Sequence, residues 1–150
     1  MKIIGNDKAE VLSVNMSKNK GTKKINMGSG EFIEDYGMRG DAHAGNSHRQ
    51  VSLLAKESID KMKESGVSSI QYGDFAENIT TKGIELHKLN VGTKLLINEV
   101  VLEVSQIGKK CHQKCEIFRE VGKCIMPTEG VFAKIISGGM VEVGDEIKKI

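Results

Sequence analysis

The glycine and proline content restricts how this chain can turn. It has 17 glycines and one proline among 150 residues. Glycine readily adopts the backbone conformations that tight turns require, and proline-initiated turns are nearly absent here. The chain is therefore suited to many short strands joined by glycine- or asparagine-based connections. Its length fits one core, and no boundary is visible, so we predict a single domain over 1–150.

Hydrophobic periodicity predicts where regular elements lie. Strands are predicted over 9–16, 49–54, 78–81, 93–97, 100–104 and 146–150. Ile59 and Met62, three positions apart among charged residues, predict a short amphipathic helix over 55–65. Regular strand–helix alternation is absent. The fold class is therefore predicted to be mainly β (α+β), a twisted, closed or nearly closed β-barrel with a few short helices.

Charge and composition exclude several classes of function. The 22 basic and 20 acidic side chains nearly balance, and tryptophan is absent, so the chain lacks the basic, base-stacking surface of a nucleic-acid-binding protein. No stretch has the length of a transmembrane helix, and the first eight residues lack a signal-peptide core. We expect no membrane contact and a cytoplasmic location. One local excess of lysines, Lys18, Lys20, Lys23 and Lys24, is either a solvated loop or a small anion-binding edge.

The three cysteines, Cys111, Cys115 and Cys124, lie within 14 positions. An odd number without an export signal argues against a disulfide framework. Lys109, Lys110, His112 and Lys114 flank the first two thiols and would favour the reactive thiolate form. Two alternatives remain open: packing as small apolar side chains, above all for Cys124, and zinc held by Cys111, His112, Cys115 and Cys124. The C-x3-C spacing and the adjacent Cys111 and His112 are unusual for structural zinc.

Three polar segments are further candidates. In 37–45, Asp41 and His43 would share one side of an extended chain and could bind a metal, or Asp41 could orient His43; Arg49 offers a fork suited to phosphate. A hydrogen-bonded structural loop is an equally good reading of this segment. The carboxylates of 73–78 are more typical of turn partners than of acid–base groups. Gly138 and Gly139 read first as a turn whose N–H groups could also cradle an anion.

Taken together, these segments resemble the MOSC domain, the module named for the C-terminal part of molybdenum-cofactor sulfurases. The resemblance runs from about Ala9 to Ile150. The matching stretches are 40–45 (GDAHAG), 49–53 (RQVSL), 73–80 (GDFAENIT), 89–92 (LNVG), 111–115 (CHQKC) and 124–133 (CIMPTEGVFA). It implies a β-rich, barrel-like fold and a role in sulfur or molybdenum-cofactor chemistry.

The resemblance further implies a cysteine that carries sulfur as a persulfide or that ligates molybdenum. Cys115 is preferred, because Glu116, Ile117 and Phe118 follow it as in the family pattern, with Cys111 as a relaying or resolving thiol. An anionic molybdenum–pterin cofactor is the implied ligand. Its binding residues would be Asp41, His43, Arg49, Lys109, Gly138 and Gly139.

The leading hypothesis is a sulfur carrier or transfer module in molybdenum-cofactor or related metal–sulfur assembly. These 150 residues hold neither the extra N-terminal barrel of larger members nor a pyridoxal-phosphate desulfurase domain. We therefore expect a separate pyridoxal-phosphate-dependent cysteine desulfurase, or another sulfur donor, as partner, and molybdenum-cofactor biosynthesis or acceptor proteins as recipients. The alternatives are a molybdopterin-binding protein with a cysteine as metal ligand and a zinc-stabilised domain without catalysis.

Overall fold

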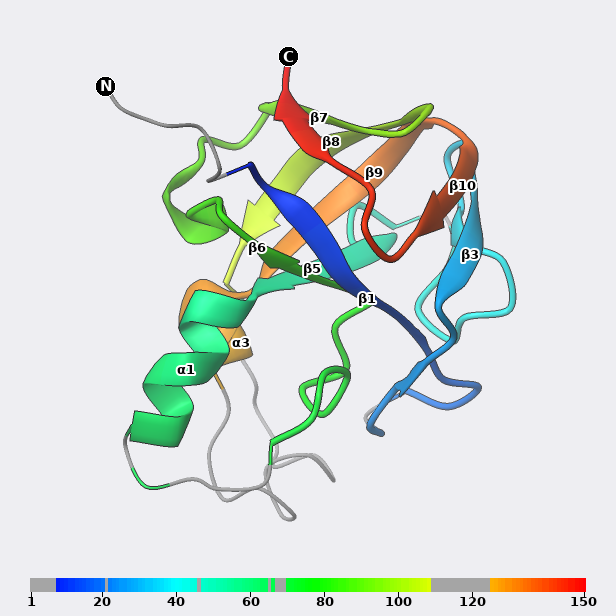
Figure 1. Ribbon diagram of the computed structural model, residues 1–150. Helices are drawn as coiled ribbons and strands as arrows, with labels where there is room; N and C mark the ends of the chain where they lie inside the picture. The colour runs from blue at the N-terminus through cyan, green and yellow to red at the C-terminus, as the bar shows by residue number, and fades with distance from the viewer. Residues whose placement is uncertain (1–7, 21, 46, 65, 67–69, 109–124) are drawn as a thin grey trace.

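The computed structural model describes residues 8–20, 22–45, 47–64, 66, 70–108 and 125–150 (Figure 1). Its elements are mainly strands. In chain order they are β1 (Glu10–Met16), β2 (Ile25–Asn26), β3 (Ser29–Ile33), β4 (Gly37–Met38), β5 (Val51–Ala55), α1 (Lys56–Glu64), β6 (Ile79–Lys82), η1 (Leu86–Lys88), β7 (Lys94–Ile97), β8 (Val100–Ile107), α3 (Met126–Glu129), β9 (Val131–Ser137), β10 (Gly139–Glu142) and β11 (Ile147–Lys149).

An eight-stranded sheet forms the body of the molecule, in the order β11-β7-β8-β9-β5-β6-β1-β2. Strand β5 lies near its middle, antiparallel to β9 and parallel to β6, and all five of its residues are buried. The parallel pair requires a crossover, and α1 supplies part of it directly after β5. A second sheet, in the order β10-β3-β4, stands beside β1 and β9 (Figure 1).

The predicted barrel is not closed among the described strands. Strand β1 and the residue before β11 share a single isolated bridge, between Glu10 and Glu146, instead of a continuous ladder. Hydrogen bonds from the Val11 N–H to the Asp145 carbonyl and from the Ile147 N–H to the Ala9 carbonyl, 2.9 and 2.8 Å, flank that bridge. Strand β11 has only three residues, too few to extend the pairing. The mainly β class with few helices is confirmed.

Two apolar clusters fill the interior. The larger cluster lies within the curved sheet and includes Leu53, Ile79 and Leu102. The smaller one lies on the outer side of β5, where Leu54 packs with Ile59 and Met62 of α1. Phe75, Met126 and Phe132 complete this second cluster and form the apolar support for the site described below.

Most strands predicted from periodicity are present with boundaries shifted by one or two residues. The helix over 55–65 is observed as α1, and Asn98, at φ 56°, makes the turn of the β7–β8 hairpin. Strand β9 was not predicted as a strand. Its run Val131–Ile135 is apolar almost throughout, because it is buried on both faces, and such a run carries no period of two. None of the helices in the described part of the chain has the length and apolar character needed to cross a membrane.

One glycine ties the 73–78 loop to the segment before β2. Gly73 has φ +97°, its carbonyl accepts the Lys24 N–H at 2.8 Å, and a Cβ there would collide with the Lys24 carbonyl oxygen. We predict that Gly73→Ala lowers the free energy of unfolding by more than 2 kcal/mol, since strain in the left-handed region and a backbone collision add. Urea denaturation measures the loss.

Gly92 is the matched control for this substitution. It has the same φ of +97°, and a Cβ there would meet nothing within 4 Å. Gly92→Ala should therefore show only the conformational term, about 1–2 kcal/mol. Equal losses for the two variants would contradict the close approach at Gly73.

Candidate functional site

A cavity of about 390 Å³ lies between the loop after β4, the start of β9 and the 73–78 loop. This volume is in the range of small-molecule sites. Phe75, Met126 and Phe132, from the second apolar cluster, form one side. The polar lining comes mainly from one stretch of the chain, with His43, Ser47, Arg49 and Ser52, and from Lys20, which is distant in sequence. Ala76 also lines the cavity.

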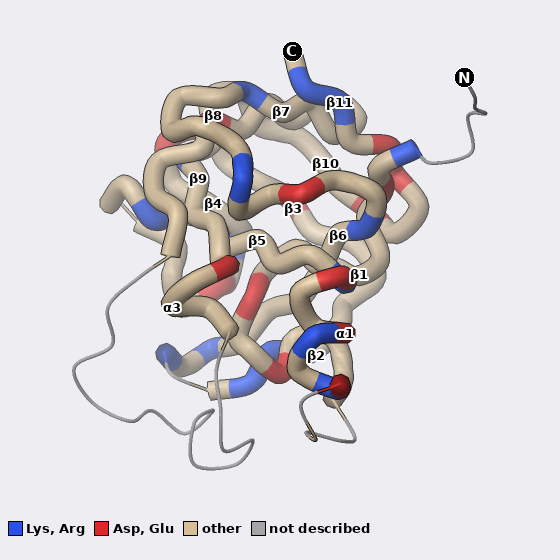
Figure 2. Tube along the Cα trace, turned by 90° about the vertical axis from the view of Figure 1, so that its left-hand side faces the viewer, with Lys and Arg blue, Asp and Glu red and all other residues tan. Residues whose placement is uncertain are grey.

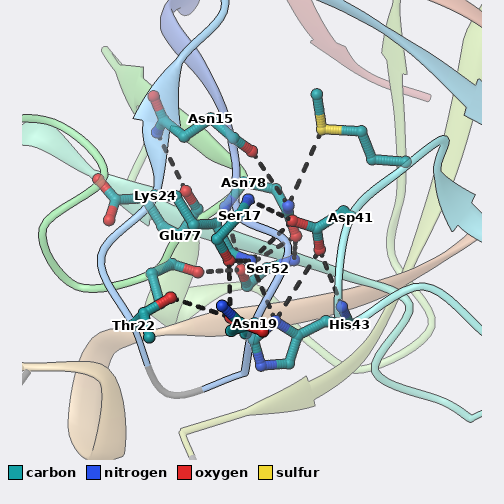
Figure 3. Close-up of polar contacts among 12 residues, drawn as sticks. Asn15, Ser17, Asn19, Thr22, Lys24, Asp41, His43, Ser52, Glu77 and Asn78 are labelled. Carbon is teal, nitrogen blue, oxygen red and sulfur yellow. Dashed lines mark hydrogen bonds and ion pairs between the residues drawn. The ribbon is translucent and has the colours of Figure 1, made fainter. Parts of the chain in front are cut away.

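A buried ion pair lies behind the polar wall. Lys24 Nζ stands 2.7 Å from Asp41 Oδ1, and both side chains are 0% exposed. Asp41 also accepts the Ser17 N–H on Oδ1 at 3.1 Å and the His43 N–H on Oδ2 at 3.0 Å (Figure 3). The carboxylate thus joins the end of β1, the residue before β2 and the turn after β4.

Burial and pairing act in opposite directions on the two charges. Burial lowers the pKa of Lys24, and the hydrogen bond and charge of Asp41 counteract that effect. For Asp41, burial raises the pKa, but the hydrogen bond and charge of Lys24, with the Ser17 N–H, outweigh it and hold the pKa below its usual value. Asp41 is therefore an anion at neutral pH, and Lys24 is its counter-charge.

His43 forms the pocket side of this network. Its Nδ1 lies 3.1 Å from Lys24 Nζ and 3.9 Å from Asp41 Oδ2, while its side chain is 31% exposed. The segment 41–44 turns instead of extending, with the Ala44 N–H bonded to the Asp41 carbonyl. Asp41 therefore orients His43 through its backbone N–H and through Lys24, and among the residues described no group of three His, Cys, Asp or Glu could hold a metal.

Cationic side chains give the pocket its charge. Lys20 and Arg49 both line it, and the Arg49 guanidinium carbon lies 5.9 Å from the centre of the Phe132 ring. In Figure 2 several basic stretches gather at the end of the molecule that carries α3 and β2. A pocket with two cations, an imidazole and two serine hydroxyls is suited to an oxyanion such as phosphate.

The 73–78 loop is held by a buried carboxylate. Glu77, 0% exposed, accepts hydrogen bonds from the Gly73 N–H, the Phe75 N–H and the Thr80 hydroxyl, at 2.9, 3.2 and 2.7 Å. Ala76, which lines the pocket, has φ +64°, a conformation that an L residue adopts only when its surroundings impose it. The interpretation of this loop as a hydrogen-bonded turn is confirmed.

The structure brings together only part of the predicted site. Asp41, His43 and Arg49 lie at or behind the pocket. Gly138 and Gly139 stand at the far end of β9 from Phe132, about 20 Å away at the usual strand rise, and a Cβ at Gly139 would meet the Glu99 side chain. Cys111, Cys115, Cys124, His112 and Lys109 lie outside the described residues.

Sequence reasoning missed Lys24 as a buried residue. It was grouped with Lys18, Lys20 and Lys23 in a solvated lysine loop or an anion-binding edge, yet it is 3% exposed whereas its neighbours face outward. Ile25, next to it, is 72% exposed, so the usual hydropathy signal is reversed here. The partner, Asp41, is 17 residues away, and no local pattern links the two.

A comparison with known protein families identifies the family of this chain. The sequence profile of the MOSC domain matches residues 40–148, which include Asp41, His43, Arg49 and the cysteine segment. The chain therefore belongs to the MOSC domain family, whose members are linked to molybdenum-cofactor-related functions. No curated protein sequence matches the chain.

Solved structures share the fold at low sequence identity. The YuaD protein from Bacillus subtilis has a TM-score of 0.79 at 19% identity, covering 93% of each chain. YiiM from Geobacillus stearothermophilus has a TM-score of 0.69 at 18% identity, covering 95% of this chain and 75% of its own. YiiM from Escherichia coli, at 0.64 and 17%, covers 95% and 69%. At these identities the likeness establishes the fold.

The buried ion pair predicts strong coupling between its two members. Lys24→Met leaves a buried carboxylate without a counter-charge, and Asp41→Asn leaves a buried ammonium, so each should lower the free energy of unfolding by about 3–5 kcal/mol. The double variant removes both charges and should lose about 1–3 kcal/mol less than the sum. A double-mutant cycle by urea denaturation measures this coupling.

Lys56 and Asp60 provide the matched surface pair. Their charged atoms are also 2.7 Å apart, but both side chains are 42% exposed, so Lys56→Met and Asp60→Asn should couple by about 0.5 kcal/mol or less.

The stabilisation by the buried pair should depend on pH. Because the folded-state pKa of Asp41 is lowered, the contribution of Asp41 to the free energy of unfolding is present at neutral pH and is lost as the pH falls below 3.8, the ordinary value. Two outcomes would contradict this account: additive effects of Lys24→Met and Asp41→Asn on the free energy of unfolding at neutral pH, or a coupling energy equal to that of the surface pair.

Proposed function

We propose that this protein is a sulfur carrier in molybdenum-cofactor or related metal–sulfur chemistry, which holds sulfur as a persulfide on Cys115 and offers it to a phosphate-bearing ligand in the pocket. The observation that carries the proposal is the position of the cationic pocket beside the chain that leaves the cysteine segment. Membership of the MOSC family supports the chemical class of the ligand.

The pocket and the cysteine segment are connected through α3. The described chain resumes at Ile125, and the next residue, Met126, lines the pocket. On the other side of the segment, the Gly108 N–H donates to the Gly130 carbonyl at 2.7 Å. The described residues that flank the cysteine segment are therefore both held beside α3, at the end of the molecule where the pocket opens.

Contacts with α1 fix α3 in this position. Glu129 accepts a hydrogen bond from the Ser58 hydroxyl at 2.5 Å and pairs with Lys61 at 2.9 Å. Burial raises the pKa of Glu129, but the hydrogen bonds from Ser58 and Lys61 outweigh this effect and keep the carboxylate ionised. Met126 packs in the second apolar cluster on the same short helix. The chain that follows the cysteine segment is thus held by packing and by charged hydrogen bonds.

The proposed transfer is an exchange of sulfur without net oxidation. The Cys115 thiolate attacks the outer sulfur of a persulfide on a cysteine desulfurase or other donor, and the donor thiolate leaves. Cys111 can then attack the inner sulfur of the Cys115 persulfide, which forms a Cys111–Cys115 disulfide and releases hydrosulfide. Flanking lysines and His112 would favour the thiolate forms.

The donor set of the pocket fits the phosphate of a pterin-type ligand. Arg49 offers a planar fork, Lys20 a second cation, and Ser47 and Ser52 hydroxyls. In the described chain no cluster of ligands for molybdenum exists, so a metal on such a ligand would depend on the cysteines. Such a ligand would supply the metal or dithiolene group that accepts sulfur, and Arg49, Lys20, Ser47 and Ser52 would bind and orient its phosphate.

The carrier role predicts uptake of sulfur by a specific cysteine. Purified protein incubated with a cysteine desulfurase and cysteine should gain the mass of one sulfur atom. A thiol reductant should remove this added mass. Cys115→Ser should abolish the gain, because the attacking thiolate is lost, and Cys111→Ser should retain it but release less hydrosulfide. Intact mass spectrometry measures the uptake.

Cys124→Ser is the control for nonspecific thiol modification and should take up sulfur as the unmodified protein does. Equal uptake by Cys115→Ser and Cys111→Ser, or none by the unmodified protein, would refute the carrier role. Molybdenum or stoichiometric zinc that co-purifies and is lost in Cys115→Ser, without sulfur uptake, would support a metal-ligand role for this cysteine instead.

Anion binding in the pocket is tested separately from sulfur uptake. Arg49→Gln should weaken the binding of inorganic phosphate about tenfold at low ionic strength, since a charged hydrogen bond is removed. Isothermal titration calorimetry measures the affinity. Arg39→Gln is the matched control, because Arg39 is 67% exposed, pairs with Glu31 and lies outside the pocket lining. An equal loss in both variants would show that only overall charge matters.

A further inference from the structure

Each of the three hydrogens on the Lys24 ammonium has a hydrogen-bond acceptor within reach. Nζ lies 2.7 Å from Asp41 Oδ1, 3.0 Å from Ser17 Oγ and 3.1 Å from His43 Nδ1 (Figure 3). A lysine ammonium has three N–H donors and no acceptor. The Ser17 hydroxyl gives its own hydrogen to the Asn19 carbonyl, at 2.9 Å, and so accepts from Lys24.

These assignments determine the tautomer of His43. Because Lys24 Nζ can only donate, His43 Nδ1 must accept and therefore carries no hydrogen. The ring is then neutral, with its hydrogen on Nε2. Placing a second hydrogen on Nδ1 would set two donors against each other at 3.1 Å, in a place where Lys24 is fully buried.

Because Nδ1 faces the Lys24 ammonium, the part of the His43 ring left to line the pocket is its other edge. Lys24 is 0% exposed and lies behind the imidazole, whereas the His43 side chain is 31% exposed and lines the pocket. The backbone N–H of His43, held by Asp41 Oδ2, fixes the position from which the ring projects.

We propose that Lys24 is a positioning residue that fixes His43 as a neutral Nε2–H donor, so that this wall of the pocket selects a ligand atom that accepts a hydrogen bond, such as an ionised phosphate oxygen. The ligand class rests on the proposed function of the pocket, whereas the tautomer does not. A ligand that presents a donor-only group at this wall, such as an ammonium or an amide N–H, is rejected because two donors would meet there.

The tautomer is measured directly by long-range proton–nitrogen correlation NMR of the imidazole rings in the full-length protein. The His43 signals, assigned by their loss in His43→Gln, should show an unprotonated Nδ1 and a protonated Nε2 at neutral pH. A protonated Nδ1 in the unmodified protein would overturn the proposal, whether or not phosphate binds.

The role of Lys24 is tested in the charge-balanced variant Lys24→Met with Asp41→Asn. Without the donor on Nδ1, the His43 ring should become a mixture of tautomers, and phosphate should bind about twofold more weakly because only part of the population presents Nε2–H. The double variant Lys56→Met with Asp60→Asn removes a surface pair of the same 2.7 Å separation and should change neither result. An unchanged tautomer in a folded Lys24→Met/Asp41→Asn protein would overturn the positioning role.

Two further variants separate hydrogen bonding by His43 from its packing. They test the proposal even if the Lys24 variant does not fold. His43→Gln keeps an N–H donor near the position of Nε2 and should retain phosphate affinity within about threefold, whereas His43→Leu should lose about tenfold. Equal affinity in the two variants would overturn donation by His43. Absence of phosphate binding by the unmodified protein, with the Nε2–H tautomer observed, would refute the proposed ligand and leave the positioning role standing.

Discussion

The buried ion pair between Lys24 and Asp41 organises the polar half of this structure. It connects the chain after β1, the residue before β2 and the turn after β4. Gly73 joins the same point through the Lys24 N–H, and Glu77 then fixes the 73–78 loop. One wall of the pocket therefore derives its shape from charges and hydrogen bonds, and the opposite wall from the second apolar cluster.

A buried ion pair is a poor way to gain stability alone. Desolvation of the two charges offsets most of their attraction, and apolar side chains of similar size often stabilise a fold as well or better. What an apolar pair cannot supply is a fixed donor on His43 Nδ1 and an acceptor for the His43 N–H. The presence of Lys24 and Asp41 is thus best explained by the orientation they give to a side chain that lines the pocket.

Sequence periodicity predicted the elements whose two faces differ. The β7–β8 hairpin alternates and helix α1 follows a helical period, because one side of each meets the core and the other is more exposed. Strand β1 was predicted from its β-branched residues, although three consecutive residues, Ser13 to Asn15, are buried. Strand β9 is buried on both sides for most of its length, and β2 and β4 have two residues each, so none of them carries a readable period. The sheet does not close between β1 and β11, because the short strand β11 does not pair along β1. The length of such a pairing cannot be predicted from composition.

The candidate site was predictable where the residue type carries the chemistry and not where tertiary placement creates it. Arg49 and His43 stand out by their functional groups in a glycine-rich setting, and the structure brings both to one cavity. Lys24 has the same functional group as Lys18, Lys20 and Lys23, and only burial against Asp41 distinguishes it. Conversely, Gly138 and Gly139 have the composition of an anion cradle, but they lie at the far end of β9, where Gly138 approaches the Phe32 backbone and Gly139 the Glu99 side chain. Lys24, whose three N–H groups all have acceptors behind the pocket wall, is therefore part of the scaffold, whereas Lys20 and Arg49 line the pocket and are the cations that a ligand could meet.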